Sequence, residues 1–169
     1  MFFNFTNITE INLSYFDISK VIKMNRMFYN CTSLTSLDLS NFNTLKVTTM
    51  SSMFTYCSSL TSLDLSNFDT SNVNDMDYMF YECINLEYIN LYNFKESKLD
   101  DLKEIFTGVP VNIVICINND NPEEKIISEI QYLDCYAINC SNDWKSKQKK
   151  FFNEIIMLIM IVIKVVKSQ

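Results

Sequence analysis

A 26-residue repeat is the feature that most limits how this 169-residue chain can fold. Residues 34–59 and 60–85 are identical at 15 of 26 positions, and the same register gives further units at 8–33 and 86–111. Several columns of the repeat stay apolar in every unit, and one is Phe28, Phe54, Phe80 and Phe106. A single unit cannot bury its apolar side, so such repeats must stack on one another and share a continuous core.

The spacing within a unit predicts one strand and one helix. Leu37 and Leu39 flank Asp38, which is the alternation of a short strand. The apolar residues that follow recur three or four positions apart, as on one face of a helix. In the second unit they are Val47, Met50, Met53, Phe54 and Cys57. We therefore predict an α/β solenoid over residues 1–111, with one short parallel strand and one short helix in each unit.

The motif LDLSNFDTSNV, followed at fixed distances by Met, Met-Phe and Cys, resembles the repeat of BspA-like leucine-rich-repeat surface proteins, also called the mycoplasma lipoprotein repeat. The resemblance covers residues 8–111. Phe42 and Phe68 stand where the commonest leucine-rich repeat has Asn or Cys, and BspA-like repeats share this feature. The resemblance implies a leucine-rich-repeat solenoid at the cell surface or outside the cell, acting as an adhesin of a bacterium or a parasitic protist.

Residues 112–133 are predicted to close the core as a C-terminal cap. The run VNIVICI at 111–117 is nearly all apolar and predicts a last buried strand. The sequence Asn-Pro-Glu-Glu at 121–124 has the pattern of a helix N-cap, a proline at the first helical position and acidic first-turn residues. A short helix with an isoleucine-rich face should therefore follow the strand.

Residues 134–169 form a Cys- and Lys-containing segment and an apolar tail. Ile155–Val166 would span about 18 Å as a helix, which is short of the ~30 Å of a bilayer core. Three readings stay open: weak membrane contact of the 151–166 tail, a tail packed on the repeats or unordered, and a frameshifted end. The chain begins inside the repeat register without a secretory signal, so we expect an upstream part to be missing.

Composition argues against catalysis and against nucleic-acid binding. The chain has no histidine, which excludes histidine-based triads and histidine metal sites. Its one glycine, Gly108, cannot form a glycine-rich phosphate loop. The net charge is −6 and Arg26 is the only arginine, so no basic face is expected. We therefore expect neither an enzyme nor a protein with a cofactor or a resident metal.

The candidate binding face lies on the predicted strands, where residues between the inward leucines must point outward. These residues are Thr35, Ser36, Asp38, Thr61, Ser62, Asp64, Glu87, Tyr88 and Asn90, with Thr9, Glu10 and Asn12 in the first unit. One interpretation is an ordinary soluble strand surface. The other is a weak, multivalent sheet that binds a protein or a glycan. A cation held between stacked Asp38 and Asp64 is a further alternative.

The cysteines form two groups. Cys31, Cys57 and Cys83 share one column, which would bring neighbours close to disulfide distance but leave one of the three unpaired. We therefore predict buried free thiols at these positions. Cys135 and Cys140 could pair with each other if the protein is exported.

Two functional hypotheses follow. The first is a non-catalytic surface or secreted repeat protein that binds a protein or glycan ligand on a host or neighbouring cell. The second is an intracellular leucine-rich-repeat scaffold for protein–protein interaction, which the missing signal peptide and the free cysteine column favour. A signal peptide encoded upstream would separate the two.

Overall fold

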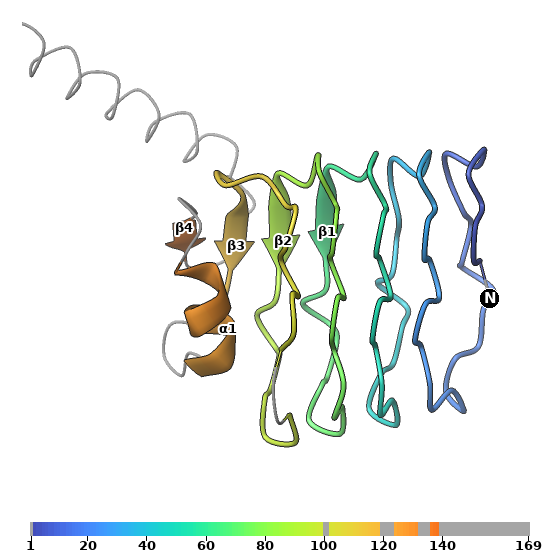
Figure 1. Cartoon of the computed structure of the whole chain (residues 1–169). Coiled ribbons are helices and arrows are strands. Elements are labelled where there is room, and N and C mark those ends of the chain that lie inside the picture. Colours follow the sequence, from blue (N-terminus) through green and yellow to red (C-terminus); the bar gives the residue numbers. More distant parts are fainter. Residues whose placement is uncertain (1, 100–101, 119–123, 132–135, 139–169) are drawn as a thin grey trace, which may run out of the picture.

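The computed structural model describes residues 2–99, 102–118, 124–131 and 136–138, and shows a row of flattened coils lying side by side (Figure 1). Its regular elements are β1 (Ser62–Asp64), β2 (Tyr88–Asn90), β3 (Val114–Cys116), α1 (Glu124–Ile130) and β4 (Tyr136–Ile138). The four strands form one sheet in the order β1-β2-β3-β4, and all neighbours are parallel. Each coil therefore returns the chain to the start of the next strand.

The register of the sheet carries the 26-residue period of the sequence. Leu63 in β1 pairs with Ile89 in β2, which pairs with Ile115 in β3. The strand segments of the first two units do not form regular strands, although the N–H of Thr35 donates to the carbonyl of Thr9 at 3.0 Å. Neighbouring coils are joined more regularly on the opposite side. We call it the turn side, and in the second unit it consists of residues 50–57.

The turn side is built of successive turns, and the helix that we predicted in each unit is wrong for the four repeats. In the second unit the N–H of Met53 donates to Met50 at 3.1 Å, and that of Cys57 to Phe54 at 3.0 Å. The N–H of Ser52, one residue before Met53, donates instead to the carbonyl of Asp77 in the next coil, at 2.8 Å. A helix needs every N–H to bond four residues back, and here alternate N–H groups leave the coil. Successive turns also place apolar residues three positions apart, which is why the spacing wrongly predicted a helix.

Two columns of the turn side have a left-handed backbone. One is Arg26, Ser52, Tyr78 and Glu104, with φ of 51° to 58°, and the other is Asn4, Asn30, Tyr56, Glu82 and Gly108, with φ of 56° to 81°. A turn whose third residue has positive φ usually places Gly or Asn there. Side chains with a Cβ cost about 1–2 kcal/mol in this conformation. The hydrogen bonds between coils must offset that cost.

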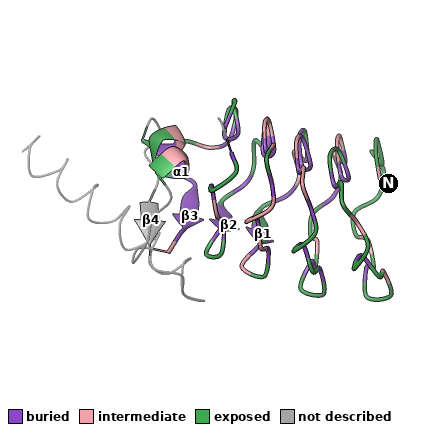
Figure 2. Cartoon of the chain, turned by 90° about the horizontal axis from the view of Figure 1, so that it is seen from below, coloured by how far each residue is buried: buried purple, intermediate pink, exposed green. Residues whose placement is uncertain are grey.

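The core is continuous through the whole row of coils, as Figure 2 shows by the buried colour along the inside of each coil. Its centre is a stack of parallel rings in the order Phe2, Phe28, Phe54, Phe80 and Phe106. Successive ring centroids lie 5.4–5.8 Å apart. Leucines of the strand segments and methionines of the turn segments enclose this stack from the two sides. The core therefore separates a strand-side face from a turn-side face.

Buried threonines join the backbones of neighbouring coils. The hydroxyl of Thr44 donates to the carbonyl of Asp69 at 3.0 Å and accepts from its N–H at 2.8 Å. Thr70 makes the same pair of bonds to Lys95, at 2.9 and 2.7 Å. Each buried hydroxyl is thus satisfied by the next coil, and these side chains serve the stack.

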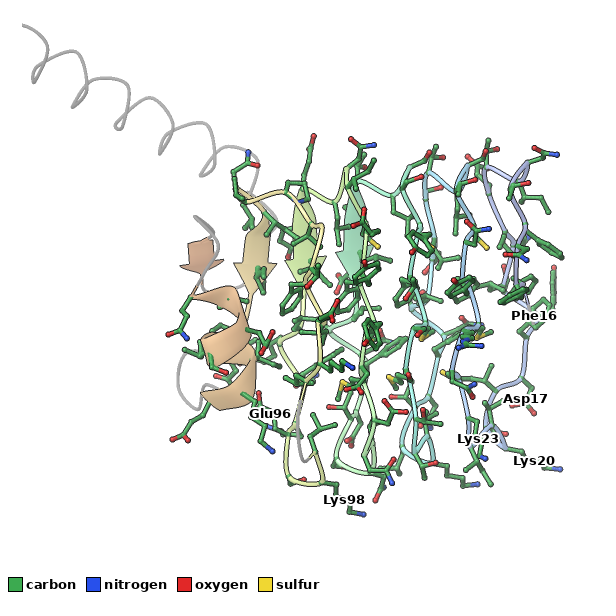
Figure 3. All side chains as sticks on the ribbon, in the orientation of Figure 1. Phe16, Asp17, Lys20, Lys23, Glu96 and Lys98 are labelled. Carbon is green, nitrogen blue, oxygen red and sulfur yellow. The ribbon has the colours of Figure 1, made fainter. Side chains whose placement is uncertain are left out.

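The next position in that column is Glu96, which caps helix α1. Its buried carboxylate accepts hydrogen bonds from the N–H groups of Lys125, at 2.8 Å, and Ile126. Figure 3 shows Glu96 beside the helix. Buried Ile126 and Ile130 then cover the end of the core. β3 and α1 lie in the segment for which the sequence predicts a strand and a helix.

Candidate functional site

The strand-side face carries an exposed polar surface across the first three units. The structure exposes Thr9, Glu10, Asn12, Thr35, Ser36, Asp38, Thr61, Ser62 and Asp64, and it also exposes Glu87 of the fourth unit. The inward neighbours Leu13, Leu39 and Leu65 are buried in the core. These polar side chains are therefore available to a ligand.

In the fourth unit Tyr88 and Asn90 are buried, so the prediction that they are exposed is wrong. Each has only 8% of its surface exposed. Tyr88 forms a second apolar cluster with Val114 and Cys116 on β3. The Oδ1 of Asn90 accepts from the N–H of Tyr92 and lies 3.1 Å from the sulfur of Cys116. Alternation predicts an outward direction for both residues, but it cannot show what packs on that side.

Asp38 and Asp64 have a structural task in the turns that end their strand segments. Each accepts a hydrogen bond of 2.9 Å from the N–H two residues later, at Ser40 and Ser66 respectively. Hydrogen bonds from Ser40 lower the pKa of Asp38 below its usual value. These are Asx turns, which explains the Asp or Asn at this position of each repeat.

A shallow hollow opens on the strand-side face between the first and second units. Its volume is about 440 Å³. It is lined by Glu10, Ile11, Asn12, Leu13, Ser14, Ser36, Asp38, Ser40 and Asn41. Four of these residues, Glu10, Asn12, Ser36 and Asp38, belong to the face expected from the sequence. The hollow therefore collects part of the predicted face into a concave polar site.

An aromatic surface on the turn side was missed by sequence reasoning. The ring of Tyr56 contacts Tyr29 and Tyr81 edge-on, with both centroid distances at 5.7 Å, and Tyr81 contacts Tyr78 in the same way. These tyrosines come from three different columns of the repeat. A column-by-column reading therefore does not bring them together, whereas superposing neighbouring columns would have done so.

The thiols of Cys31, Cys57 and Cys83 are free and buried, as the sequence predicts. Cys57 and Cys83 each donate to a carbonyl of the preceding coil at 3.1 Å. Burial raises the pKa of all three thiols, that of Cys83 to about 12. Such thiols are unreactive, so the column is structural.

Cys116 is disulfide-bonded, which the sequence did not predict. Cys135 and Cys140, for which a pairing with each other was expected, lie outside the described residues. The 3.1 Å approach of the Cys116 sulfur to Asn90 is therefore a contact and not a hydrogen bond, because a disulfide sulfur carries no proton.

The described residues contain no group of three or more carboxylate or thiol side chains that could hold a metal. In the same part of the chain, no helix is long and apolar enough to cross a membrane. The 151–166 tail, for which weak membrane contact was one expectation, lies outside the described residues.

Comparison with known proteins places the repeats in a family. A profile described as "Mycoplasma protein of unknown function, DUF285" matches residues 1–114. No curated protein and no solved structure matches the chain. The matched part spans all four repeats and the stacked coils that they form, so the chain belongs to the Mycoplasma repeat family DUF285.

Proposed function

We propose that the chain is a BspA-like leucine-rich-repeat protein that binds a protein or glycan ligand at the cell surface and has no catalytic role. Support for the repeat type comes from the LDLSNF motif and from coils that stack with a 26-residue period. Support for binding comes from the strand-side hollow, which combines side chains of two neighbouring units.

The observation that carries this proposal is the presence of uncommitted polar groups in the hollow. Among the described residues, the carboxylate of Glu10 and the hydroxyl of Ser36 have no hydrogen-bonding partner. Asp38 accepts hydrogen bonds from the side chain and the N–H of Ser40 and adds a second negative charge to the hollow. Free acceptors and a donor on rigid neighbouring coils suit the hydroxyls of a sugar or the amides of a peptide.

The shape of the hollow suggests a weak single contact. It is shallow and open, so a ligand would bury little surface in it, and affinity would come from repetition. Two carboxylates favour a neutral or cationic ligand over an anionic one. An adhesive surface displayed in many copies would fit these properties.

The disulfide of Cys116 supports export from the cytoplasm, because disulfides persist in oxidising compartments. The three free thiols do not oppose this placement. They are buried and hydrogen-bonded, so an oxidising environment would leave them intact.

A hollow-filling variant tests the proposed ligand site. We expect Ser36→Tyr to abolish binding of the chain to arrays of immobilised glycans and extracellular-matrix proteins. Ser62→Tyr is the matched control, because Ser62 is the equivalent residue one coil further on and lies outside the hollow. Equal binding by wild type and Ser36→Tyr would overturn the assignment of the hollow as the ligand site.

A further inference from the structure

A second surface, partly exposed, lies on the turn side and is separate from the strand-side hollow. We call it the tyrosine–glutamate patch, and it consists of Tyr56, Tyr78, Tyr81, Glu82 and Glu104. The shared core lies between the turn segments and the strand segments, so this patch faces away from the hollow. A ligand of one surface therefore need not touch the other.

The rings of the patch are held in a fixed arrangement. Tyr81 lies edge-on between Tyr56 and Tyr78, with both centroid distances at 5.7 Å and interplanar angles of 88° and 72°. The N–H of Tyr56 donates to the carbonyl of Tyr81 at 2.9 Å, which ties the two coils at this point. Binding a ligand here would cost little ordering entropy.

The backbone of the patch is strained. Tyr56, Tyr78, Glu82 and Glu104 all have positive φ, between 51° and 61°. Asn30 and Gly108 occupy the same column as Tyr56 and would suit the turn without a bulky side chain. The ring of Tyr56 is 39% exposed and adds little to the core. The same positive φ recurs at Arg26 and Ser52, so it belongs to the turns of the repeat, and what distinguishes Tyr56 is its exposed ring.

The patch carries negative charge that Lys103 offsets in part, because Glu104 and Tyr78 both act on its ammonium group. Glu82 and Glu104 have no salt bridge with any described residue. The pKa of the Tyr81 hydroxyl is raised, first by burial and then by Tyr56, Glu82 and Glu104, so both carboxylates act on this ring. A cation brought to Tyr81 would meet the rings and the two carboxylates together.

Two rings, Tyr78 at one edge of the patch and Tyr29 beside its other edge, each have a cation of the chain close to them. The guanidinium of Arg26 lies 5.8 Å from the centre of the Tyr29 ring, and the ammonium of Lys103 lies 5.5 Å from that of Tyr78. Among the described residues, Tyr56 and Tyr81 have no such cation. The chain thus supplies cations at both flanks and leaves the centre open.

We infer that the tyrosine–glutamate patch binds the lysine or arginine side chains of a basic segment on a partner protein. The cation would lie against Tyr56 and Tyr81, with Glu82 and Glu104 neutralising it. Aromatic rings beside carboxylates are the chemistry that recognises a positively charged side chain. This surface is an addition to the proposed ligand site and does not depend on it.

The test measures binding of hexalysine to the full chain by isothermal titration calorimetry at low salt. We expect Glu82→Gln and Tyr56→Leu each to weaken binding by about 2- to 5-fold. Tyr56→Phe keeps the ring and should bind like the wild type. Circular dichroism of each variant shows whether it is folded.

Two matched controls separate the patch from general attraction to a chain of net charge −6. Glu87→Gln removes the same charge on the strand side, and Tyr15→Leu removes a tyrosine that is 94% exposed in the first unit. Both controls should retain wild-type affinity. Equal losses for Glu82→Gln and Glu87→Gln would overturn the inference. So would binding of the neutral sugar cellohexaose, lost in Tyr56→Leu, without binding of hexalysine.

Discussion

The buried carboxylate of Glu96 accepts a hydrogen bond of 2.8 Å from the backbone N–H of Lys125, at the start of helix α1 and 29 residues further along the chain. Thr44 and Thr70, in the same column, bond in this way to the next coil. At the last repeat there is a helix to reach, and the longer side chain of Glu spans that distance. One column of the repeat therefore joins the coils and also fixes the cap.

Removing the Glu96 carboxylate should destabilise the protein. Glu96→Ala leaves the first N–H groups of α1 without acceptors, and we expect the free energy of unfolding to fall by about 1–3 kcal/mol. Urea denaturation measures this loss. Glu87→Ala, an exposed glutamate on the strand side, should change stability by less than about 0.5 kcal/mol. Equal effects of the two substitutions would refute the capping role.

The buried hydroxyl of Thr70 provides a second test of the bonds between coils. Thr70→Val keeps the shape but leaves the N–H of Lys95 without its 2.7 Å acceptor. We expect a loss of about 1–3 kcal/mol in urea denaturation. Thr61→Val is the control, since Thr61 is exposed. If Thr70→Val is as stable as the wild type, the column does not stabilise the stack.

Gly108 is the one position where the left-handed turn excludes a side chain. Its φ is +81°, and an added Cβ would lie 2.8 Å from Cδ and 3.0 Å from Cα of Glu82. We expect Gly108→Ala to lower stability by about 1–2 kcal/mol. In the background of Glu82→Ala the loss should be smaller, because the closest side-chain atoms are gone. An undiminished loss in that background would assign the cost to φ and to the Glu82 backbone.

The buried thiols predict a loss of stability in base. The pKa of Cys83 rises from 9.0 to about 12 on folding, because burial disfavours the thiolate. Above pH 9 the unfolded chain loses this proton and the folded chain keeps it, so the unfolded state binds fewer protons. The stabilisation is complete below pH 9.0 and is lost as the pH rises towards 12.

The comparison of wild type with Cys83→Ala isolates this effect. We expect the free energy of unfolding to fall more steeply between pH 8 and pH 11 in the wild type than in the variant, with each measured by urea denaturation. Tyrosines and lysines titrate in both chains and cancel in the difference. Parallel curves would mean that Cys83 titrates normally in the folded protein.

The period and the core could be predicted from the sequence because they depend on local repetition. A column such as Phe28, Phe54 and Phe80 has to be buried in every unit, and the strand register shifts by the same 26 residues. The free thiols of Cys31, Cys57 and Cys83 followed from the same argument and are confirmed.

Local repetition could not show whether each unit contains a helix. Apolar positions near Met50 and Met53 fit both a helix and successive turns, and the choice depends on where the N–H of Ser52 finds its acceptor. That acceptor lies in the next coil. The spacing within a single unit carries no information about that acceptor. The positive φ of Ser52 and Tyr56 could not be predicted either, because neither residue is a glycine.

The candidate site was predictable only where the face stays open. Ser36 and Asp38 lie in the hollow because no described residue covers the first two units on the strand side. Tyr88 and Asn90 have the same outward alternation but are buried by packing from beyond their own repeat. A sequence pattern gives the direction of a side chain and not its neighbours.

The measurement that tests the central claim most directly is trypsin shaving of intact cells that produce this chain, followed by mass spectrometry of the released peptides. Lys20, Lys46 and Lys98 are exposed, and Figure 3 shows Lys20 and Lys98 along the same edge of the coils, so folded repeats offer cleavage sites. We predict release of peptides from residues 24–103 while a cytosolic marker stays inside. Release only after lysis would contradict the surface role and favour an intracellular scaffold.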